Sequence, residues 1–335
     1  MARRSLHGRP APGMARRSPR WWPVIGAQLE RTPAAARTQQ LTRGVQRRGP
    51  VVRGGTAPFR MLSGRVAVIT GAGRGIGARA AQMLARHGAA VVVNDMSAEP
   101  AHSLAKSIRD GGGKAFAYAG SVTEKAFPAG ILQAAATEFG PVDILVNNAG
   151  FTWDGMLHRM SDEQWETIAD VHVGAPFRMI RAAAPYMRDA GKKEISAGAQ
   201  PRDRCIVNVS STSGLHGNVG QANYAAAKLG VVGLTKTVAK EWGAYGVRCN
   251  AVAYGFIDTR LTRSAEEQGE SMEGLDGKVV LGIPERTRSM LTDPAMLGAM
   301  IPMARMGTAE EAAGGIMMLA SPWATYVNGH VLEVC

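Results

Sequence analysis

The sequence of 335 residues has little cysteine and no long apolar run. Its three cysteines, Cys205, Cys249 and Cys335, form no paired pattern and no C-x-x-C motif. This argues against a disulfide framework and a zinc site, and it favours a reducing compartment. No run of about 18 apolar residues occurs, so the sequence predicts no transmembrane helix. We therefore expect a cytoplasmic protein with no metal ion and no membrane partner.

The first 60 residues lack lysine and almost lack acids. They contain 13 arginines and one acid, Glu30, and they carry the whole net charge of +12, because the remaining residues hold 26 basic and 26 acidic side chains. We expect 1–60 to be a disordered basic leader, since its Arg-, Pro- and Gly-rich composition has no steady hydrophobic period. It could be a mitochondrial transit peptide, an arm for nucleic acid or a membrane surface, or an upstream extension with Met61 as the natural start. We prefer the extension and expect no nucleic-acid partner.

A tyrosine and a lysine stand four residues apart in Tyr224-Ala-Ala-Ala-Lys228. On a helix this spacing puts both side chains on one face. A free phenol has a pKa of about 10, and a nearby ammonium lowers it, which can yield an acid/base group that works near neutral pH. Ser211 ends an apolar run that indicates a buried strand, so the three groups could converge on one carbonyl oxygen. The spacing alone would also suit an exposed helix face.

A glycine-rich turn stands between a predicted strand at 65–70 and a predicted helix that ends near residue 87. It reads Gly71-Ala-Gly-Arg-Gly-Ile-Gly77. Glycines in this context let the backbone approach a pyrophosphate at the helix N-terminus. The turn therefore indicates a dinucleotide site, although its T-G-x-x-x-G-x-G spacing differs from the common G-x-G-x-x-G.

The next predicted strand ends at Asp95, 18 residues after Gly77. A carboxylate there would accept a hydrogen bond from the adenosine ribose 2′-hydroxyl and would repel a 2′-phosphate, which favours NAD. Arg74 argues for NADP, because a guanidinium in the glycine turn can hold that phosphate. We expect NAD(H) to be preferred over NADP(H). A solvated turn residue is the other interpretation of Asp95.

Predicted strands and helices alternate along the chain from residue 65 onward. Strands are expected at 65–70, 89–94, 114–119 and 142–150. The helices between them are expected after the glycine turn to about 87, at 98–110 and at about 124–139. This alternation predicts the α/β class with one doubly wound parallel sheet flanked by helices. Ligands bind beyond the carboxyl ends of such strands. Polar residues that mark these ends are Thr70, Asp95, Ser121, Asn148 and Ser211.

Four motifs make the segment 63–334 resemble the short-chain dehydrogenase/reductase family. They are TGAGRGIG at 70–77, NNAG at 147–150, the serine thirteen residues before the tyrosine, and YAAAK at 224–228. The stretches 150–165 and 217–242 are similar to the 3-oxoacyl-[acyl-carrier-protein] reductase branch. The resemblance implies a single Rossmann-type domain over 61–335 that interconverts a ketone and a secondary alcohol by hydride transfer with NAD(P). A small-molecule or acyl-thioester substrate is expected, most directly a 3-oxoacyl thioester.

Other functions stay open at this point. The substrate could be a hydroxyacyl-CoA, a steroid, a sugar or a xenobiotic alcohol. The chain could also be a family member that binds the cofactor without catalysis. The resemblance further implies a homo-oligomer, either a tetramer or a dimer.

The resemblance assigns roles to particular residues. Tyr224 would be the acid/base, Lys228 would lower its pKa and bind the nicotinamide ribose, and Ser211 would position the carbonyl. The pyrophosphate side would be held by Gly71, Arg74, Gly75, Ile76 and Gly77. Asp95 would select the adenosine ribose, and Ser121 and Val122 would border the adenine. The cleft wall would be formed by Asn148, Ala149 and Gly150, and the nicotinamide amide would contact Ile257 and Thr259.

Three positions depart from the family pattern. His172 stands where relatives carry an asparagine that holds a relay water. A histidine can donate and accept, so we expect either a relay with an altered pH profile or a satisfied core histidine. Ala253-Tyr-Gly255 replaces the usual Pro-Gly, and Ser121 replaces an acid on the adenine side.

Two stretches resemble insertions. We expect 191–204 to be a polar surface loop and about 260–300 to be the substrate loop. Eight of the 17 methionines fall in 272–318. Methionine fills irregular apolar space, so these side chains could form a lid over an acyl chain or pack an ordinary core.

Overall fold

The structure is a computed structural model that describes residues 60–262, 271–274, 277–280 and 293–335. The expected leader, except for its last residue, and the greater part of the expected substrate loop lie outside these residues. Among the described residues, no helix combines the length and the apolar composition that a membrane crossing needs.

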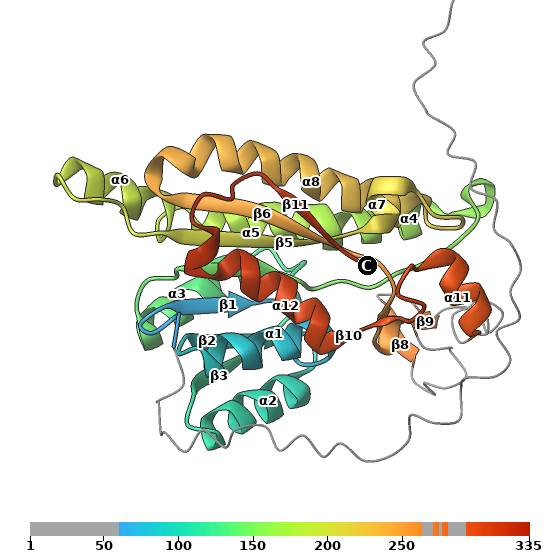
Figure 1. Ribbon diagram of the computed structural model, residues 1–335, viewed down its shortest axis with the longest axis horizontal. Helices are drawn as coiled ribbons and strands as arrows, with labels where there is room; N and C mark the ends of the chain where they lie inside the picture. Colours follow the sequence, from blue (N-terminus) through green and yellow to red (C-terminus); the bar gives the residue numbers. More distant parts are fainter. Residues whose placement is uncertain (1–59, 263–270, 275–276, 281–292) are drawn as a thin grey trace, which may run out of the picture. The chain divides into compact units, whose positions relative to one another are not determined.

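A seven-stranded parallel sheet lies at the centre of the described structure (Figure 1). Its strand order is β11-β6-β5-β4-β1-β2-β3, and every neighbouring pair is parallel. The strands are β1 (Val66–Ile69), β2 (Ala90–Asp95), β3 (Lys114–Ala119), β4 (Ile144–Asn147), β5 (Arg204–Ser211), β6 (Val247–Tyr254) and β11 (Val331–Val334). The strand order reverses beside β1, the kind of point at which open α/β sheets bind ligands. The predicted α/β, doubly wound fold is confirmed.

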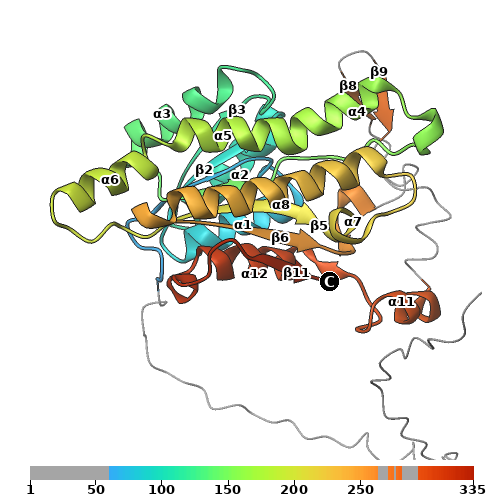
Figure 2. The same ribbon diagram turned by 90° about the horizontal axis from the view of Figure 1, so that it is seen from above.

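Helices cover both faces of the sheet. Figure 2 shows α1 and α12 on one side of the sheet and α5 on the other. The first layer consists of α1 (Gly75–Arg86), α2 (Ala98–Asp110) and α12 (Ala309–Ala320). The second consists of α3 (Phe127–Phe139), α5 (Ala175–Ala183) and α8 (Ala222–Trp242). In β1, Ala67 and Ile69 pack with the first layer, whereas Val66 and Val68 pack with the second. Burial on both faces explains why these strands are continuous apolar runs in the sequence.

Shorter elements connect these layers. The helical ones are α4 (Asp162–Ala169), the π-helical turn η2 (Asp170–Gly174), α6 (Arg188–Ser196), α7 (Thr212–His216), α11 (Pro294–Met300) and the 3₁₀ turns η1 (Leu157–Arg159), η3 (Gly243–Tyr245), η4 (Arg260–Thr262) and η5 (Pro322–Ala324). The short strands are β7 (Ile257–Asp258), β8 (Ser271–Gly274), β9 (Gly277–Val280) and β10 (Gly307–Thr308). Parallel pairing of β7 with β10 joins the two ends of the expected substrate loop.

The expectation of a polar loop over 191–204 is wrong in its first part, because α6 extends to Ser196. The segment has no apolar periodicity, so its helix depends on charged contacts. Glu194 on α6 forms an ion pair of 2.5 Å with Arg204 at the start of β5, and it accepts a hydrogen bond of 2.8 Å from the backbone N–H of Arg202. These contacts fix α6 against the sheet.

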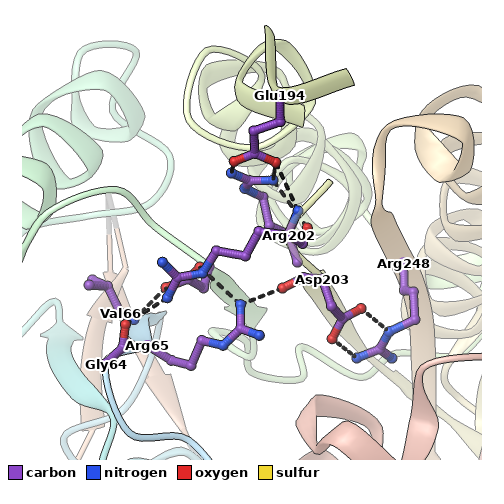
Figure 3. Close-up of polar contacts among 9 residues, drawn as sticks. Gly64, Arg65, Val66, Glu194, Arg202, Asp203 and Arg248 are labelled. Atoms are coloured by element: carbon purple, nitrogen blue, oxygen red, sulfur yellow. Dashed lines mark hydrogen bonds and ion pairs between the residues drawn. The ribbon is translucent and has the colours of Figure 1, made fainter. Parts of the chain in front are cut away.

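Further ion pairs surround the amino ends of β1, β4, β5 and β6 (Figure 3). Arg65 and Arg202 both pair with Asp143, at 3.3 Å and 2.6 Å. Asp143 also accepts a hydrogen bond from the backbone N–H of Val66. Arg248 makes two hydrogen bonds to the carboxylate of Asp203, at 2.8 and 3.2 Å. We call this set the amino-end network, defined as Arg65, Asp143, Glu194, Arg202, Asp203, Arg204 and Arg248.

Candidate active site

A cleft of about 1480 Å³ opens at the carboxyl ends of the central strands. Every residue to which the sequence analysis assigned a catalytic or cofactor-binding role lines this cleft. These are Gly71, Arg74, Gly75, Ile76, Gly77, Asp95, Ser121, Val122, Asn148, Ala149, Gly150, Ser211, Tyr224, Lys228, Ile257 and Thr259. They come from segments far apart in the chain, and the parallel sheet brings their strand ends to one side.

The glycine turn after β1 packs too closely for side chains. Gly71 has a φ of +61°, and a Cβ there would lie 2.6 Å from the Cα of Ala149. A Cβ on Gly77 would lie 2.4 Å from the carbonyl oxygen of Gly71. At the N-terminus of α1, the N-cap residue Arg74 contributes no capping side-chain hydrogen bond. The N–H groups of this first turn therefore suit an anion such as a pyrophosphate.

Two asparagines, the buried Asn94 and the partly buried Asn148, brace this turn, and the sequence analysis assigned no such role to them. Asn148 donates from Nδ2 to the carbonyl oxygens of Thr70, at 3.0 Å, and of Gly71, at 2.8 Å. Asn94 accepts from the N–H of Gly71 and donates at 3.0 Å to the carbonyl oxygen of Gly120. The available signal for Asn94 was a single polar residue inside the apolar run of β2.

Backbone hydrogen bonds orient the carboxylate of Asp95 at the end of β2. Its Oδ2 accepts from the N–H of Gly73 at 3.1 Å, and its Oδ1 accepts from the N–H of Ser97 at 3.1 Å. The carboxylate is thus held beside the glycine turn at the adenosine end expected for the cleft. Ser121 lies across this end, and its hydroxyl is 2.7 Å from that of Thr123.

Tyr224 and Lys228 lie one turn apart on α8, as the spacing predicted. Lys228 is buried, and its Nζ donates at 2.7 Å to the carbonyl oxygen of Val209. The same Nζ lies 5.5 Å from the centroid of the Tyr224 ring. Ser211 ends β5, where its Oγ accepts from the N–H of Ser213 at 3.1 Å and donates at 3.3 Å to the carbonyl oxygen of Tyr254.

Burial controls the protonation of this pair. Desolvation raises the pKa of Tyr224 to about 12, although hydrogen bonding with Ser211 acts in the opposite direction. Desolvation also lowers the pKa of Lys228 to about 7. The expectation that the ammonium would lower the Tyr224 pKa is therefore not met in this structure, because burial disfavours the charged forms of both groups.

The substrate side of the cleft is tied to α8 by amide side chains that the sequence analysis did not single out. Asn223 donates to the carbonyl oxygens of Trp153 and Gln164, both at 3.1 Å, and its Oδ1 accepts from the N–H of Tyr224 at 2.7 Å. Gln221 donates at 3.0 Å to the carboxylate of Asp154. Two amide side chains within the three residues before Tyr224 were the only signal in the sequence.

His172 is buried in the π-helical turn η2, next to Tyr224. The two rings meet edge to face, with their centroids 5.1 Å apart. The Nε2 atom lies 2.7 Å from the carbonyl oxygen of Phe151, whereas Nδ1 is buried and has no hydrogen-bond partner among the described residues. The ring is therefore not a fully satisfied core histidine.

At Ala253-Tyr-Gly255, where the sequence departs from the family pattern, the backbone of Gly255 lies close to the C-terminal strand. A Cβ on Gly255 would lie 2.6 Å from the Cβ of Cys335, and the N–H of Gly255 donates at 3.0 Å to the carbonyl oxygen of Val334. Just beyond, Thr262 donates from its hydroxyl to the carbonyl oxygen of Ile257 at 2.7 Å. Ile257 and Thr259 line the same cleft as Tyr224.

Comparison with known proteins assigns the chain to a family. The family described as short chain dehydrogenase matches residues 65–270. The chain belongs to the short-chain dehydrogenase family. It is therefore an NAD(P)-dependent oxidoreductase that acts on CH–OH groups and interconverts a ketone and a secondary alcohol.

Several relatives align with this short-chain dehydrogenase over most of their lengths. The 3-oxoacyl-[acyl-carrier-protein] reductase of Thermotoga maritima is 36% identical, over 82% of this chain and 97% of the relative. The reductase of the same name from Vibrio cholerae is 38% identical, over 82% and 96%. The hydroxyacyl-CoA dehydrogenase ChsB1 of Mycobacterium tuberculosis is 45% identical, over 82% and 78%.

The cleft of this short-chain dehydrogenase fits a nicotinamide dinucleotide. Gly71, Gly75 and Gly77 of the glycine turn line the cleft, and so do the polar residues Asp95, Asn148 and Ser211 at or just after the ends of β2, β4 and β5. Among the described residues, no group of three or more His, Cys, Asp and Glu side chains has the arrangement of a metal site.

Proposed function

We propose that this short-chain dehydrogenase reduces 3-oxoacyl thioesters with NADH. The observation that carries the proposal is the convergence of Ser211, Tyr224 and Lys228 on one end of a cleft whose other end holds Asp95. The Thermotoga and Vibrio relatives, whose names give 3-oxoacyl-[acyl-carrier-protein] reductase activity, support the substrate class.

Each of the three residues has a distinct task in this proposal. The bound nicotinamide supplies the hydride to the carbonyl carbon. Ser211 donates a hydrogen bond to the carbonyl oxygen, and Tyr224 gives that oxygen its proton as negative charge develops there. Lys228 holds the nicotinamide ribose and, when charged, stabilises the phenolate that remains.

The protonation of Tyr224 supports the direction of reduction at neutral pH. A pKa raised to about 12 keeps the phenol protonated, which is the form that an acid needs. Oxidation needs the phenolate, so its rate should rise with pH while the rate of reduction stays level or falls. Turnover numbers in both directions from pH 6 to 10 test this, and a reduction rate that rises with pH would contradict it.

We propose NAD(H) as the preferred cofactor because the carboxylate of Asp95 is held beside the glycine turn. A carboxylate in that position repels a 2′-phosphate and accepts from a 2′-hydroxyl. We expect kcat/KM to be at least about tenfold higher with NADH than with NADPH, the value of one charge-assisted hydrogen bond. Asp95→Ala should remove this preference, and Asp110→Ala, at an exposed acid on α2, should not.

Measurement of kcat/KM with NADH and with NADPH, in the unaltered protein, Asp95→Ala and Asp110→Ala, tests this cofactor preference. Higher kcat/KM with NADPH in the unaltered protein would contradict the NAD preference without affecting the assignment of the chemistry. A preference that persists in Asp95→Ala would show that another residue determines it.

A second candidate is a hydroxyacyl-CoA dehydrogenase, favoured by the 45% identity to the Mycobacterium relative of that name. The same residues would catalyse the reverse reaction, the oxidation of the hydroxyl group, with the Tyr224 phenolate as the base. The two functions differ in the thioester carrier and in direction. We therefore propose to compare acetoacetyl-CoA, the same acyl group on an acyl carrier protein, and 3-hydroxybutyryl-CoA. A strong preference for the carrier-protein thioester in reduction supports the first function, and efficient oxidation of the CoA ester at pH 7 supports the second.

The assembly and the cellular compartment are further proposals. Trp165, Phe177 and Leu229 are large exposed apolar side chains on α4, α5 and α8, which supports a homo-oligomer, either a dimer or a tetramer. Light scattering after gel filtration would measure its mass, and a monomer would contradict it. We propose a cytoplasmic enzyme, supported by the free buried thiols of Cys205 and Cys249, and fluorescent fusions with and without residues 1–60 would test for mitochondrial targeting.

A further inference from the structure

We propose that Asp154 is a specificity-determining residue of the active site, which excludes substrates that carry a carboxylate beside the reacting carbonyl. The oxidoreductase therefore reduces neutral 3-oxo esters and thioesters and rejects the corresponding free 3-oxo acids. This inference deepens the proposed function, on which it rests, because it names the chemical form in which the acyl group must be presented.

The carboxylate of Asp154 is held at a fixed place in the wall of the cleft. Nε2 of the buried Gln221 donates to its Oδ2 at 3.0 Å, and Oε1 of Gln221 accepts at 3.1 Å from Nδ2 of Asn218. The N–H of the next residue, Gly155, donates at 2.8 Å to the carbonyl oxygen of Gly220. All five residues line the cleft, so both the side chain and the backbone around Asp154 are fixed there.

This carboxylate has no cationic partner among the described residues. Asp154 is exposed on the cleft wall, yet partial desolvation raises its pKa, and the hydrogen bond from Gln221 acts in the opposite direction. An aspartate ordinarily titrates near a pH of about 3.9, so the group is ionised at pH 8. Its charge reaches the catalytic phenol, since burial is the main cause of the raised Tyr224 pKa and Asp154 adds to it.

Asp154 lies close to the place of the reacting carbonyl. Its partner Gln221 precedes Tyr224 by three residues at the start of α8, and residues three apart on a helix are neighbours. A 3-oxo acid whose carbonyl oxygen meets Ser211 and Tyr224 has its carboxylate two bonds from the carbonyl carbon, at the same end of the cleft as Asp154. A methyl ester or a thioester of this acid carries no charge there.

The repulsion is large enough to decide between the two forms of substrate. At an effective dielectric constant of about 20, like charges about 6 Å apart repel by an energy equivalent to roughly 100-fold in kcat/KM. Water and salt in the open cleft screen the charges, so we expect roughly tenfold or more.

Three basic side chains also line the cleft, namely Arg74, Lys228 and Arg260. Arg74 stands in the glycine turn, and Arg260 follows Thr259, whose methyl group lies 3.9 Å from the Cβ position of Gly75. Their backbones therefore lie on the side expected to face the pyrophosphate. Desolvation lowers the pKa of Lys228 to about 7, so its amine is largely uncharged at pH 8. These groups are unchanged in the variants below, so their effects cancel in the comparison.

Two variants change the charge at this place in the cleft. Asp154→Asn removes the charge and keeps the contact with Gln221, because Oδ1 of asparagine can accept from the same Nε2. Val219→Lys adds a positive charge beside Gly220, at a side chain that is 83% exposed and lines the cleft, so the fold should tolerate it. Asp162→Asn is the matched control, because Asp162 is an exposed acid on α4 outside the cleft wall.

The measurement is the ratio of kcat/KM for methyl acetoacetate to kcat/KM for acetoacetate at pH 8, with whichever of NADH and NADPH the protein prefers. We expect this ratio to fall at least roughly tenfold in Asp154→Asn and in Val219→Lys, and to stay within about twofold in Asp162→Asn. Cofactor binding, followed by fluorescence, checks that each variant is folded. A purely structural role for Asp154 would change both substrates alike and leave the ratio unchanged.

An unchanged ratio in Asp154→Asn would overturn the inference. So would an unaltered protein that reduces acetoacetate at the rate of its methyl ester, or that reduces neither. Failure of the proposed function has a different signature: reduction of the methyl ester without reduction of a 3-oxoacyl thioester rejects the thioester substrate, while the ratio still tests Asp154.

Discussion

Buried charged groups have different partners at the two ends of the central strands. At the amino ends, each carboxylate of the network has an arginine partner, and Asp143 has two, at 2.6 and 3.3 Å (Figure 3). At the carboxyl ends, Lys228 is buried with a backbone carbonyl as its hydrogen-bond acceptor, and its pKa is lowered to about 7. At the amino ends the buried carboxylates are paired, although burial still raises the pKa of Asp143, and removal of one partner would leave charges uncompensated. A buried lysine without an ionic partner and with a perturbed pKa, as at the carboxyl ends, is typical of catalytic groups.

Charges without ionic partners in a low-dielectric site cost free energy, and the rest of the protein must offset that cost. The amino-end network restrains the entry into β1, β4 and β5, while the cleft retains groups that can take up or release protons. The following variants test each end separately.

The largest expected effect on stability is at Asp143. Asp143→Ala should lower the free energy of unfolding by about 3–5 kcal/mol, because it leaves Arg65, Arg202 and the N–H of Val66 without their shared acceptor. Urea unfolding measures it, with Asp110→Ala on exposed α2 as the control. Turnover of the folded fraction should stay unchanged, and a large loss of turnover would show that the two ends are coupled.

The next effect is on catalysis. Ser211→Ala should lower kcat roughly 100- to 1000-fold, equivalent to about 3–4 kcal/mol of transition-state stabilisation, because one donor to the carbonyl oxygen is lost. Ser210→Ala is a matched control, since the neighbouring hydroxyl donates to the carbonyl oxygen of Lys228 instead. Equal losses in both variants would argue against a role for Ser211 at the reacting oxygen.

Stability should depend on pH through Lys228. Its folded pKa of about 7 is below its model-peptide value of 10.5, so the unfolded chain binds more protons between these limits and stability rises with pH. From pH 7 to 9 the gain should be about 2 kcal/mol, and Lys228→Met should remove it. The buried thiols of Cys205 and Cys249, whose pKa values are raised, oppose the trend at higher pH, so the range ends at 9. An identical slope in the variant would contradict the lowered Lys228 pKa.

The smallest effect is at Glu194. Its ion pair with Arg204 lowers the pKa of the carboxyl to about 2, but Glu194 stands at the surface end of the network. Glu194→Gln should cost about 1 kcal/mol of stability and leave turnover unchanged. Thermal unfolding at pH 7 would measure it, and a loss as large as that of Asp143→Ala would mean that α6 is essential to the whole network.

The sequence was sufficient for the sheet and for the outline of the cleft. Apolar runs that end in Thr70, Asp95 and Asn148 predicted parallel strands whose polar ends face one crevice, because strand direction fixes where those ends lie. Nothing comparable marked α6, whose residues lack an apolar stripe and depend on the ion pair between Glu194 and Arg204.

Protonation and hydrogen bonding inside the cleft could not be predicted from spacing. The four-residue separation of Tyr224 and Lys228 gave their proximity, but the raised pKa of the phenol depends on how many protein atoms surround it. His172 was noticed as an unusual residue, yet its unpaired Nδ1 follows from contacts with segments more than twenty residues away. Such properties arise only from tertiary packing.

The central claim is that Tyr224 supplies the proton when the carbonyl is reduced. Single-turnover oxidation of bound NADH by acetoacetyl-CoA, followed by absorbance, tests it in Tyr224→Phe and in Tyr254→Phe. The second variant removes a buried hydroxyl that donates to the carbonyl oxygen of Ala312. We predict that Tyr224→Phe slows the turnover at least roughly 1000-fold while NADH still binds, and that Tyr254→Phe stays within about tenfold of the unaltered protein. A Tyr224→Phe enzyme that turns over as fast as Tyr254→Phe would contradict the account.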